Sequence, residues 1–314
     1  MKKINRSWIF GFFACLCALT LAVAVSGCAQ SASSASSASS AGAGSGDASA
    51  STNEATASDS AGGWYASAKE TPEGYKLVKE GTLIGTSDMA YPPLESVVEG
   101  KSDEYEGFEI DLVTEVAKRL NLKMEWLSPM KFDTIIPLIK QGGKADVGVS
   151  SFTINDERKK EIDFTESYID SNQAIVMKKG SDKKGANDSE TEKNLNAKGI
   201  VVCVQQGTTG EEWVQENLPN AECKPLDNAI DCLQNLESGK CDAVVADLPC
   251  MAFYCKESFT GQEVAVQIPT GESYGIVVSK DNAKLTAAMD KAIKEMKSDG
   301  TIDKLMEKWF GGNI

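Results

Sequence analysis

The feature that most constrains the fold is an alternation of short apolar segments with amphipathic segments, which begins near residue 82. In the first amphipathic segment, Ile110, Val113 and Val116 recur at helical spacing and define one apolar face. By the same criterion we expect strands at 82–87, 123–127 and 145–150, and helices at 109–122 and 132–143. An alternating strand-helix order is typical of a parallel sheet flanked by helices.

The same order returns after a polar stretch at 180–198. Here we expect strands at 198–206, 221–226 and 241–247, and helices at 209–218 and 228–239. The segment GGKADVGVSS in the first round corresponds to SGKCDAVVAD in the second. The chain ends with an expected strand at 274–279 and helices at 285–300 and 301–312. The sequence therefore predicts an α/β chain with two similar lobes, each a mainly parallel sheet flanked by helices.

Polar residues follow several of the expected strands. In open parallel sheets, ligands bind outside the carboxyl ends of the strands. The residues at these positions are Asp88, Ser150, Ser151, Gln206, Gly207 and Asp247. The sequence thus predicts a binding site at these strand ends.

Composition excludes several classes of function. The formal net charge is -14 and the estimated pI is 4.7, which opposes nucleic-acid binding because that binding depends on Lys and Arg. The chain has no histidine, so histidine-dependent catalytic triads and zincin sites are excluded. It also lacks a CxxC pair and a Walker A sequence. We predict no metal, no cofactor and no nucleic-acid partner.

The N-terminus has the pattern of an export signal. Lys2, Lys3 and Arg6 precede an apolar run at 8–25, and small residues follow it. The alternative is a permanent transmembrane anchor, since the run approaches the ~20 residues needed to span a bilayer. The segment VSGC resembles a bacterial lipobox, which implies cleavage before Cys28 and lipid attachment to its sulfur. Residues 1–27 are therefore predicted to be a lipoprotein signal peptide.

Residues 28–63 consist mostly of Ser, Ala, Gly and Thr, including the repeat SASSASSASS. A segment with so little apolar surface is predicted to be a disordered linker. As a flexible chain it would reach roughly 30–35 Å. The same composition leaves glycosylation open.

Six further segments occur in the order found in one protein family. They are GTSDMAYPPLE, GFEIDLVTEVAKRL, SSFTINDERKKEIDFTESY, VQQGTTGEEW, CDAVVADLP and KSDGTIDKLMEKWFG. With them the chain resembles the family 3 extracellular solute-binding proteins, the amino acid receptors of ABC importers. The resemblance extends from about Leu77 to Gly312. It implies the type II periplasmic-binding-protein-like fold, with two lobes joined by a two-strand hinge.

The resemblance also implies how each end of an amino acid is bound. Arg158, the last residue of a T-x-x-x-x-R motif, corresponds to the residue that binds the ligand carboxylate. Asp247 corresponds to the residue that pairs with the ligand ammonium, aided by the Ser151 carbonyl. Such a pair suits a zwitterion, whose two charges need partners in a partly dry site. Thr153 and Thr209, next to Thr208, would also contact the carboxylate.

The remaining candidates would contact the ligand side chain. The resemblance places Tyr91 and Phe132 where aromatic rings stack on it, and makes Asp88, Ser150 and Gln205 selectors. An acid at Asp88 favours a polar or basic amino acid. From residue type alone the alternatives are a solvated Arg158, core aromatics and Asp247 as a helix N-cap.

The resemblance further implies a receptor that closes on its ligand and then docks on an ABC permease. We place the hinge near 169–175 and 269–275, so that the first lobe comprises 64–172 with 273–314 and the second 173–272. We expect a monomer, lipid-anchored at the cell membrane outside the cytoplasm, without enzymatic activity. The alternatives are a cyclohexadienyl or prephenate dehydratase-like enzyme on the same fold and the sensing half of a signalling receptor.

Six cysteines lie in the predicted second lobe: Cys203, Cys223, Cys232, Cys241, Cys250 and Cys255. An even number in an exported domain is compatible with disulfides. Buried free thiols are the alternative. The sequence leaves both open.

Overall fold

The computed structural model describes residues 63–311. The predicted signal peptide, the lipidation site Cys28 and nearly all of the predicted linker lie outside these described residues. Within 63–311, no helix combines the length and apolar character required to cross a membrane.

The described chain alternates helices and strands much as the sequence predicts. The strands are β1 (Thr82–Thr86), β2 (Ala90–Tyr91), β3 (Glu95–Val97), β4 (Tyr105–Glu106), β5 (Lys123–Trp126), β6 (Val147–Gly148), β7 (Asp163–Phe164), β8 (Ile169–Lys178), β9 (Val201–Gln205), β10 (Glu222–Leu226), β11 (Ala243–Asp247), β12 (Gln262–Tyr274) and β13 (Val277–Val278). The helices are α1 (Gly63–Ser67), α2 (Phe108–Arg119), α3 (Phe132–Gln141), α4 (Asp156–Glu161), α5 (Asp188–Leu195), α6 (Thr209–Asn217), α7 (Ala229–Glu237), α8 (Leu248–Glu257), α9 (Ala283–Ser298) and α10 (Thr301–Phe310), with a short 3-10 turn at Lys280–Asn282.

Two five-stranded sheets organise the described chain. Their strand orders are β5-β1-β6-β13-β7 and β10-β9-β11-β8-β12. In each sheet the first three strands are parallel, and the other two pair antiparallel. The predicted α/β, two-lobed fold is confirmed, and we call the parts built on these sheets the first lobe and the second lobe. The sheets are mixed because the chain returns along β13 and β8 in the opposite direction.

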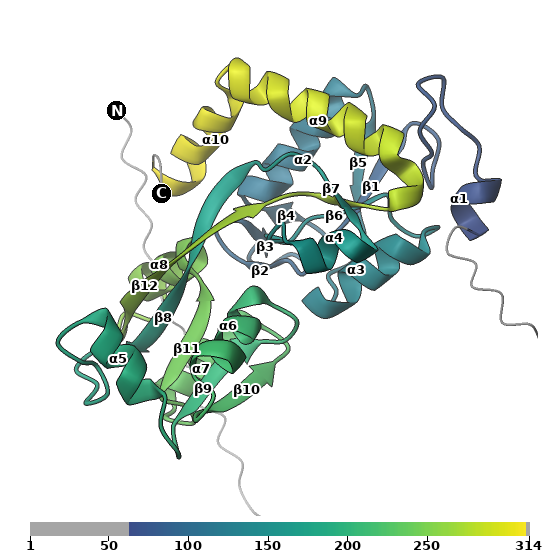
Figure 1. The fold of residues 1–314 in the computed structure, drawn as a ribbon. Helices are drawn as coiled ribbons and strands as arrows, with labels where there is room; N and C mark the ends of the chain where they lie inside the picture. Colours follow the sequence, from purple (N-terminus) through teal and green to yellow (C-terminus); the bar gives the residue numbers. More distant parts are fainter. Residues whose placement is uncertain (1–62, 312–314) are drawn as a thin grey trace, which may run out of the picture. The chain divides into compact units, whose positions relative to one another are not determined.

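The two long strands β8 and β12 run side by side (Figure 1). They pair antiparallel from Ile169 with Tyr274 to Lys178 with Gln262, and the register is irregular between Ile268 and Glu272. Beyond β12, the Gly275 N–H donates to the carbonyl of Phe152, so the chain rejoins the first lobe. The predicted hinge segments therefore fall on a paired ribbon.

Some elements differ from the expectations. The polar stretch at 180–198 contains α5, whose first turn is capped by the Asn187 side chain. A further helix, α8, begins directly after Asp247, where Pro249 suits a first helical turn. The strands expected at 145–150 and 274–279 shorten to β6 and β13, and β2, β3 and β4 form a small third sheet. Periodicity gives little information on such short or polar elements.

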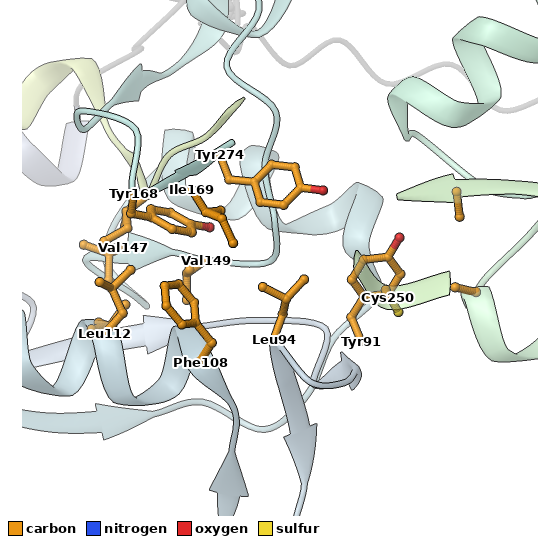
Figure 2. Close-up of a cluster of buried hydrophobic side chains, with 14 of the residues drawn as sticks. Tyr91, Leu94, Phe108, Leu112, Val147, Val149, Tyr168, Ile169, Cys250 and Tyr274 are labelled. Carbon is orange, nitrogen blue, oxygen red and sulfur yellow. The ribbon is translucent and has the colours of Figure 1, made fainter. Parts of the chain in front are cut away.

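Aromatic and aliphatic side chains fill the space between the first sheet and α2. Phe108, Leu112 and Tyr274 are fully or almost fully buried. Figure 2 shows Phe108 beside Tyr168, and Tyr91 directed toward Cys250 of α8. One apolar cluster thus includes residues of the first lobe and Cys250 of the second.

All six cysteines of the described chain are free thiols. The neighbouring Cys232 and Cys241 thiols lower the pKa of Cys203, and burial opposes this change. The Cys203 sulfur and, after it, burial raise the pKa values of Cys232 and Cys241. Of the two sequence alternatives, the structure shows buried or partly buried thiols rather than disulfides.

Candidate functional site

All of the predicted ligand-contact residues line one cavity. They are Asp88, Tyr91, Phe132, Ser150, Ser151, Thr153, Arg158, Gln205, Thr208, Thr209 and Asp247. Gln206 and Gly207, which the sequence also placed at a strand end, do not line this cavity. The cavity measures about 10 Å³, which is about the space of one water molecule. The walls must therefore separate before a molecule the size of an amino acid can enter.

Arg158 lies on α4, in the first lobe, where Asn155 caps the helix by accepting from the Arg158 N–H. Its guanidinium donates to two backbone carbonyls, Thr153 at 3.0 Å and Gly207 at 3.1 Å. It also lies 5.5 Å from the ring centre of Phe132, which favours a cation. Burial lowers its pKa, while the charges of nearby carboxylates raise it. Within the described residues the guanidinium thus bonds to neutral oxygens and remains available to a carboxylate.

Asp247 ends β11 in the second lobe and faces the first lobe across the cavity. Its carboxylate accepts from the Tyr91 hydroxyl at 2.9 Å and from the Gln173 side-chain amide at 2.5 Å. Burial raises the pKa of Asp247 to about 7, Glu272 adds to the increase, and the hydrogen bonds oppose it. An ammonium group placed here would favour the ionised form.

Asp88 and Gln205 lie at the ends of equivalent strands of the two sheets and meet across the cavity. The Gln205 amide donates to Asp88 at 2.6 Å and to the Asp227 carbonyl at 3.1 Å. Burial raises the pKa of Asp88 to about 6, and the Gln205 hydrogen bond lowers it in part. This end of the cavity offers a carboxylate to a polar or cationic side chain.

Two buried glutamates hold the doubled serine in place. The Ser150 hydroxyl donates to Glu95, and the Ser151 N–H and hydroxyl donate to Glu109 at 2.9 and 3.1 Å. Ser151 has a positive φ of 51°, which is uncommon for a residue other than glycine. Burial and the Glu109 charge raise the pKa of Glu95 well above its usual value. Because both hydroxyls already donate, they present oxygen lone pairs to the cavity.

The three threonines surround the start of α6. The Thr208 hydroxyl is the N-cap, accepting from the Glu211 N–H at 3.2 Å and donating to the Gln205 carbonyl at 2.7 Å. Thr209 and Thr153 come from different lobes, and their hydroxyl oxygens are 3.5 Å apart. A helix N-terminus carries partial positive charge, so this region favours an anion.

Four polar residues of this region were not predicted from the sequence: Gln173, Glu272, Glu95 and Glu109. Gln173 lies on β8 and contacts Asp247, while Glu272 lies on β12 and contacts Thr153 and Thr209. No strand-end pattern marks them, because they lie inside the paired ribbon or behind the serines. A charged residue on the apolar face of a predicted helix, as Glu109 is in 109–122, was the one available signal.

Residues 63–311 include no group of three or more Cys, Asp or Glu side chains arranged to hold a metal ion. The chemistry of the cavity is instead that of a guanidinium and a carboxylate on opposite walls, with amide and hydroxyl groups between them. Together with the two mixed sheets, this defines a two-lobed, type II periplasmic-binding-protein-like structure.

Residues 83–312 match the family model described as bacterial extracellular solute-binding proteins, family 3. The chain belongs to this family. Among curated relatives, the L-cystine-binding protein TcyJ of Escherichia coli (strain K12) is 32% identical over 244 residues, covering 76% of this chain and 86% of that protein. The lysine/arginine/ornithine-binding periplasmic protein of the same strain is 32% identical over 249 residues, covering 76% and 91%.

Solved structures agree with the fold. An ancestral arginine-binding protein bound to arginine is 40% identical, with a TM-score of 0.67 and coverage of 74% of this chain and 99% of that one. The ancestral amino acid-binding protein AncCDT-1, described as a precursor of cyclohexadienyl dehydratase, is 36% identical, with a TM-score of 0.66 and coverage of 73% and 96%.

Proposed function

We propose that this chain is the substrate-binding lipoprotein of an ABC importer and captures a free polar or basic amino acid between its lobes. The proposal rests on the placement of two opposite charges on opposite walls of one cavity: Arg158 from the first lobe and Asp247 from the second. The two charges match the carboxylate and ammonium of an amino acid. Neither lobe alone offers both partners.

The ligand carboxylate is bound by Arg158 and by the N-terminal end of α6 at Thr208 and Thr209. A guanidinium and a helix N-terminus both favour an anion, and their effects add. The ligand ammonium pairs with Asp247 and with the carbonyl of Ser151. In this arrangement each charged end of the ligand contacts both lobes.

The ligand side chain extends toward Asp88, between the rings of Tyr91 and Phe132. Selection by Asp88, Ser150 and Gln205 favours hydrogen-bonding or cationic side chains, because a buried carboxylate needs a donor or a counter-charge. The relatives include proteins named for binding cystine, glutamine, lysine, arginine and ornithine, which supports a polar or basic ligand.

Binding requires hinge motion along β8 and β12. We propose lobe boundaries at 64–172 with 273–314 and at 173–272, with the crossings inside the ribbon. Opening breaks contacts between the lobes, such as the hydrogen bond from Gln206 to Asp133 at 3.0 Å. Closure then completes both charge pairs, so the ligand stabilises the closed form.

For the anchor, we propose removal of residues 1–27, fatty acylation of Cys28 and a flexible linker up to residue 63. The basic, apolar and small-residue order of the sequence supports this assignment. Labelling cells with an alkynyl palmitate analogue should mark the wild-type protein and leave Cys28→Ser unmarked. Equal labelling of the two would contradict the lipid anchor.

The binding proposal is tested by thermal unfolding of the full chain in detergent with each free amino acid in turn. At a hundredfold excess over Kd, a true ligand should raise Tm by roughly 5–10 °C. A protein that no amino acid stabilises and that consumes prephenate would instead be a dehydratase-like enzyme. The similarity to AncCDT-1, a precursor of cyclohexadienyl dehydratase, is the observation that favours this second candidate.

A further inference from the structure

Glu272, on β12, joins the two lobes through a single carboxylate oxygen. Its Oε2 atom accepts from the hydroxyl of Thr153, in the first lobe, at 2.7 Å. The same atom accepts from the hydroxyl of Thr209, in the second lobe, at 3.0 Å. The Gln173 amide lies 3.3 and 3.2 Å from the two carboxylate oxygens. A protein carboxylate thus bridges the two threonines that are expected to contact the ligand carboxylate.

A threonine hydroxyl has one hydrogen to donate. In this structure the hydroxyls of Thr153 and Thr209 both donate to Glu272, so neither can donate to a second carboxylate. Two carboxylates at adjoining positions would also repel each other in a site partly removed from water. Glu272 and a ligand carboxylate therefore cannot both hold these two hydroxyls.

Charge balance points the same way. Glu272 lies close enough to Asp247 for its charge to help raise the pKa of Asp247. Arg158 is the cation that faces these carboxylates from the first lobe, and its guanidinium donates to the carbonyls of Thr153 and Gly207. The Arg158 guanidinium therefore remains available to a ligand carboxylate, whereas the hydroxyls of Thr153 and Thr209 are already engaged.

We propose that Glu272 competes with the ligand's α-carboxylate for the hydroxyls of Thr153 and Thr209. When the lobes are in contact, Glu272 takes the hydroxyls of Thr153 and Thr209 and stabilises an arrangement whose cavity is too small for an amino acid. When a ligand binds, both hydroxyl hydrogen bonds pass from Glu272 to the ligand carboxylate. The inference rests on the proposed function and assigns Glu272 the role of weakening affinity for every α-amino acid.

The expected consequence is thermodynamic. A protein that spends part of its time in an arrangement unable to bind shows a weaker apparent affinity, in proportion to the competent fraction. Removing the competitor raises that fraction and frees two hydroxyl donors. Every ligand gains from the larger competent fraction, but the gain is greatest for ligands with an ionised carboxylate, because only they form charge-assisted hydrogen bonds with those donors.

The test compares the full chain with Glu272→Ala, Glu272→Gln and the control Glu263→Ala. Glu263 also lies on β12 but pairs with Lys184 at the surface, 3.0 Å away. The probes are L-arginine, L-lysine and L-glutamine and the α-carboxamide of each, titrated by calorimetry. For the amino acid that binds, Glu272→Ala should lower Kd about tenfold, since charge-assisted hydrogen bonds are gained.

Glu272→Gln keeps the shape of the side chain and an accepting oxygen but lacks the charge, so it should lower Kd about threefold. If the alanine variant does not fold, the glutamine variant provides the test. Glu263→Ala should match wild type. In the Glu272 variants each carboxamide should gain less affinity than the matching amino acid, because a neutral amide forms no charge-assisted hydrogen bonds with the freed donors. An unchanged or weaker affinity in both Glu272 variants overturns the inference alone. If wild type and variants alike bind none of these probes and no other free amino acid, the proposed function is overturned and this inference with it.

Discussion

The first sheet has the strand order β5-β1-β6-β13-β7, and the second has β10-β9-β11-β8-β12. Position by position, β1 corresponds to β9 and β6 to β11. In each lobe an aspartate lies just before one parallel strand and accepts from the backbone of its neighbour. Before β6, Asp146 accepts from the Ile84 N–H of β1 at 2.8 Å. Before β11, Asp242 accepts from the Val201 N–H of β9 at 2.9 Å.

The two lobes differ in the residues at the carboxyl ends of these equivalent strands. After β6 the first lobe places Ser151 and then Arg158, whereas β11 of the second lobe ends directly on Asp247. The shared scaffold brings both strand ends to one cavity, and the local sequence then gives them opposite charge. Ligand specificity can therefore change at a few loop positions while the sheets stay the same.

Arg158→Ala should have the largest effect, because it removes the cation of the first lobe. We expect Kd for the amino acid ligand to rise by about 100-fold or more, since a charge-assisted, partly buried contact is lost. Calorimetric titration measures this. Lys159→Ala is the matched control, because Lys159 is on the same helix and lies 3.9 Å from the exposed Asp156. A Kd within threefold of wild type would remove Arg158 from the site.

Asp146→Ala should destabilise the fold more than Asp242→Ala. Asp146 is fully buried and accepts from the N–H groups of both Val78 and Ile84, whereas one such bond is made by Asp242. We expect losses in unfolding free energy of about 2 and about 1 kcal/mol, measured by urea unfolding. Equal losses would mean that the two aspartates are equivalent in energy as well as in position.

Burial raises the pKa of Asp146 to about 7. A raised folded-state pKa means that the folded protein favours the protonated carboxyl. Its contribution to stability is present below about pH 4 and is lost as pH rises through about 7. In Asp146→Asn this part of the pH dependence of urea unfolding should disappear, and its persistence would assign it to another group.

Asp247, the proposed partner of the ligand ammonium, should make ligand affinity depend on pH. Asp247 has a pKa of about 7, and pairing with an ammonium lowers it. Binding then releases a proton, so affinity should increase about tenfold between pH 5 and pH 7. Titrations in two buffers of different ionisation enthalpy measure the release. Asp247→Asn should bind weakly and with a flatter pH profile, and an unchanged slope would point to Asp88 instead.

The sequence predicted the repeated scaffold well because buried strands and amphipathic helices have strong periodicities. The helix expected at 109–122 is α2, and its apolar face is buried as predicted. Residues at strand ends were also identified, since topology places Ser150 after a strand of the first sheet and Asp247 at the end of a strand of the second. Gln173 and Glu272 were not, because alternation along a strand does not tell where two long strands cross the site.

Contacts at the rim between the lobes should have the smallest effect. Lys131 and Asp227 form an ion pair of 2.7 Å between the lobes, with side chains 59% and 51% exposed. Exposed pairs contribute about 0–1 kcal/mol, because water and salt screen them. Lys131→Ala should therefore change ligand Kd by less than about twofold at about 0.15 M salt. A tenfold change would mean that the rim, and not the charged walls of the cavity, governs closure of the two lobes.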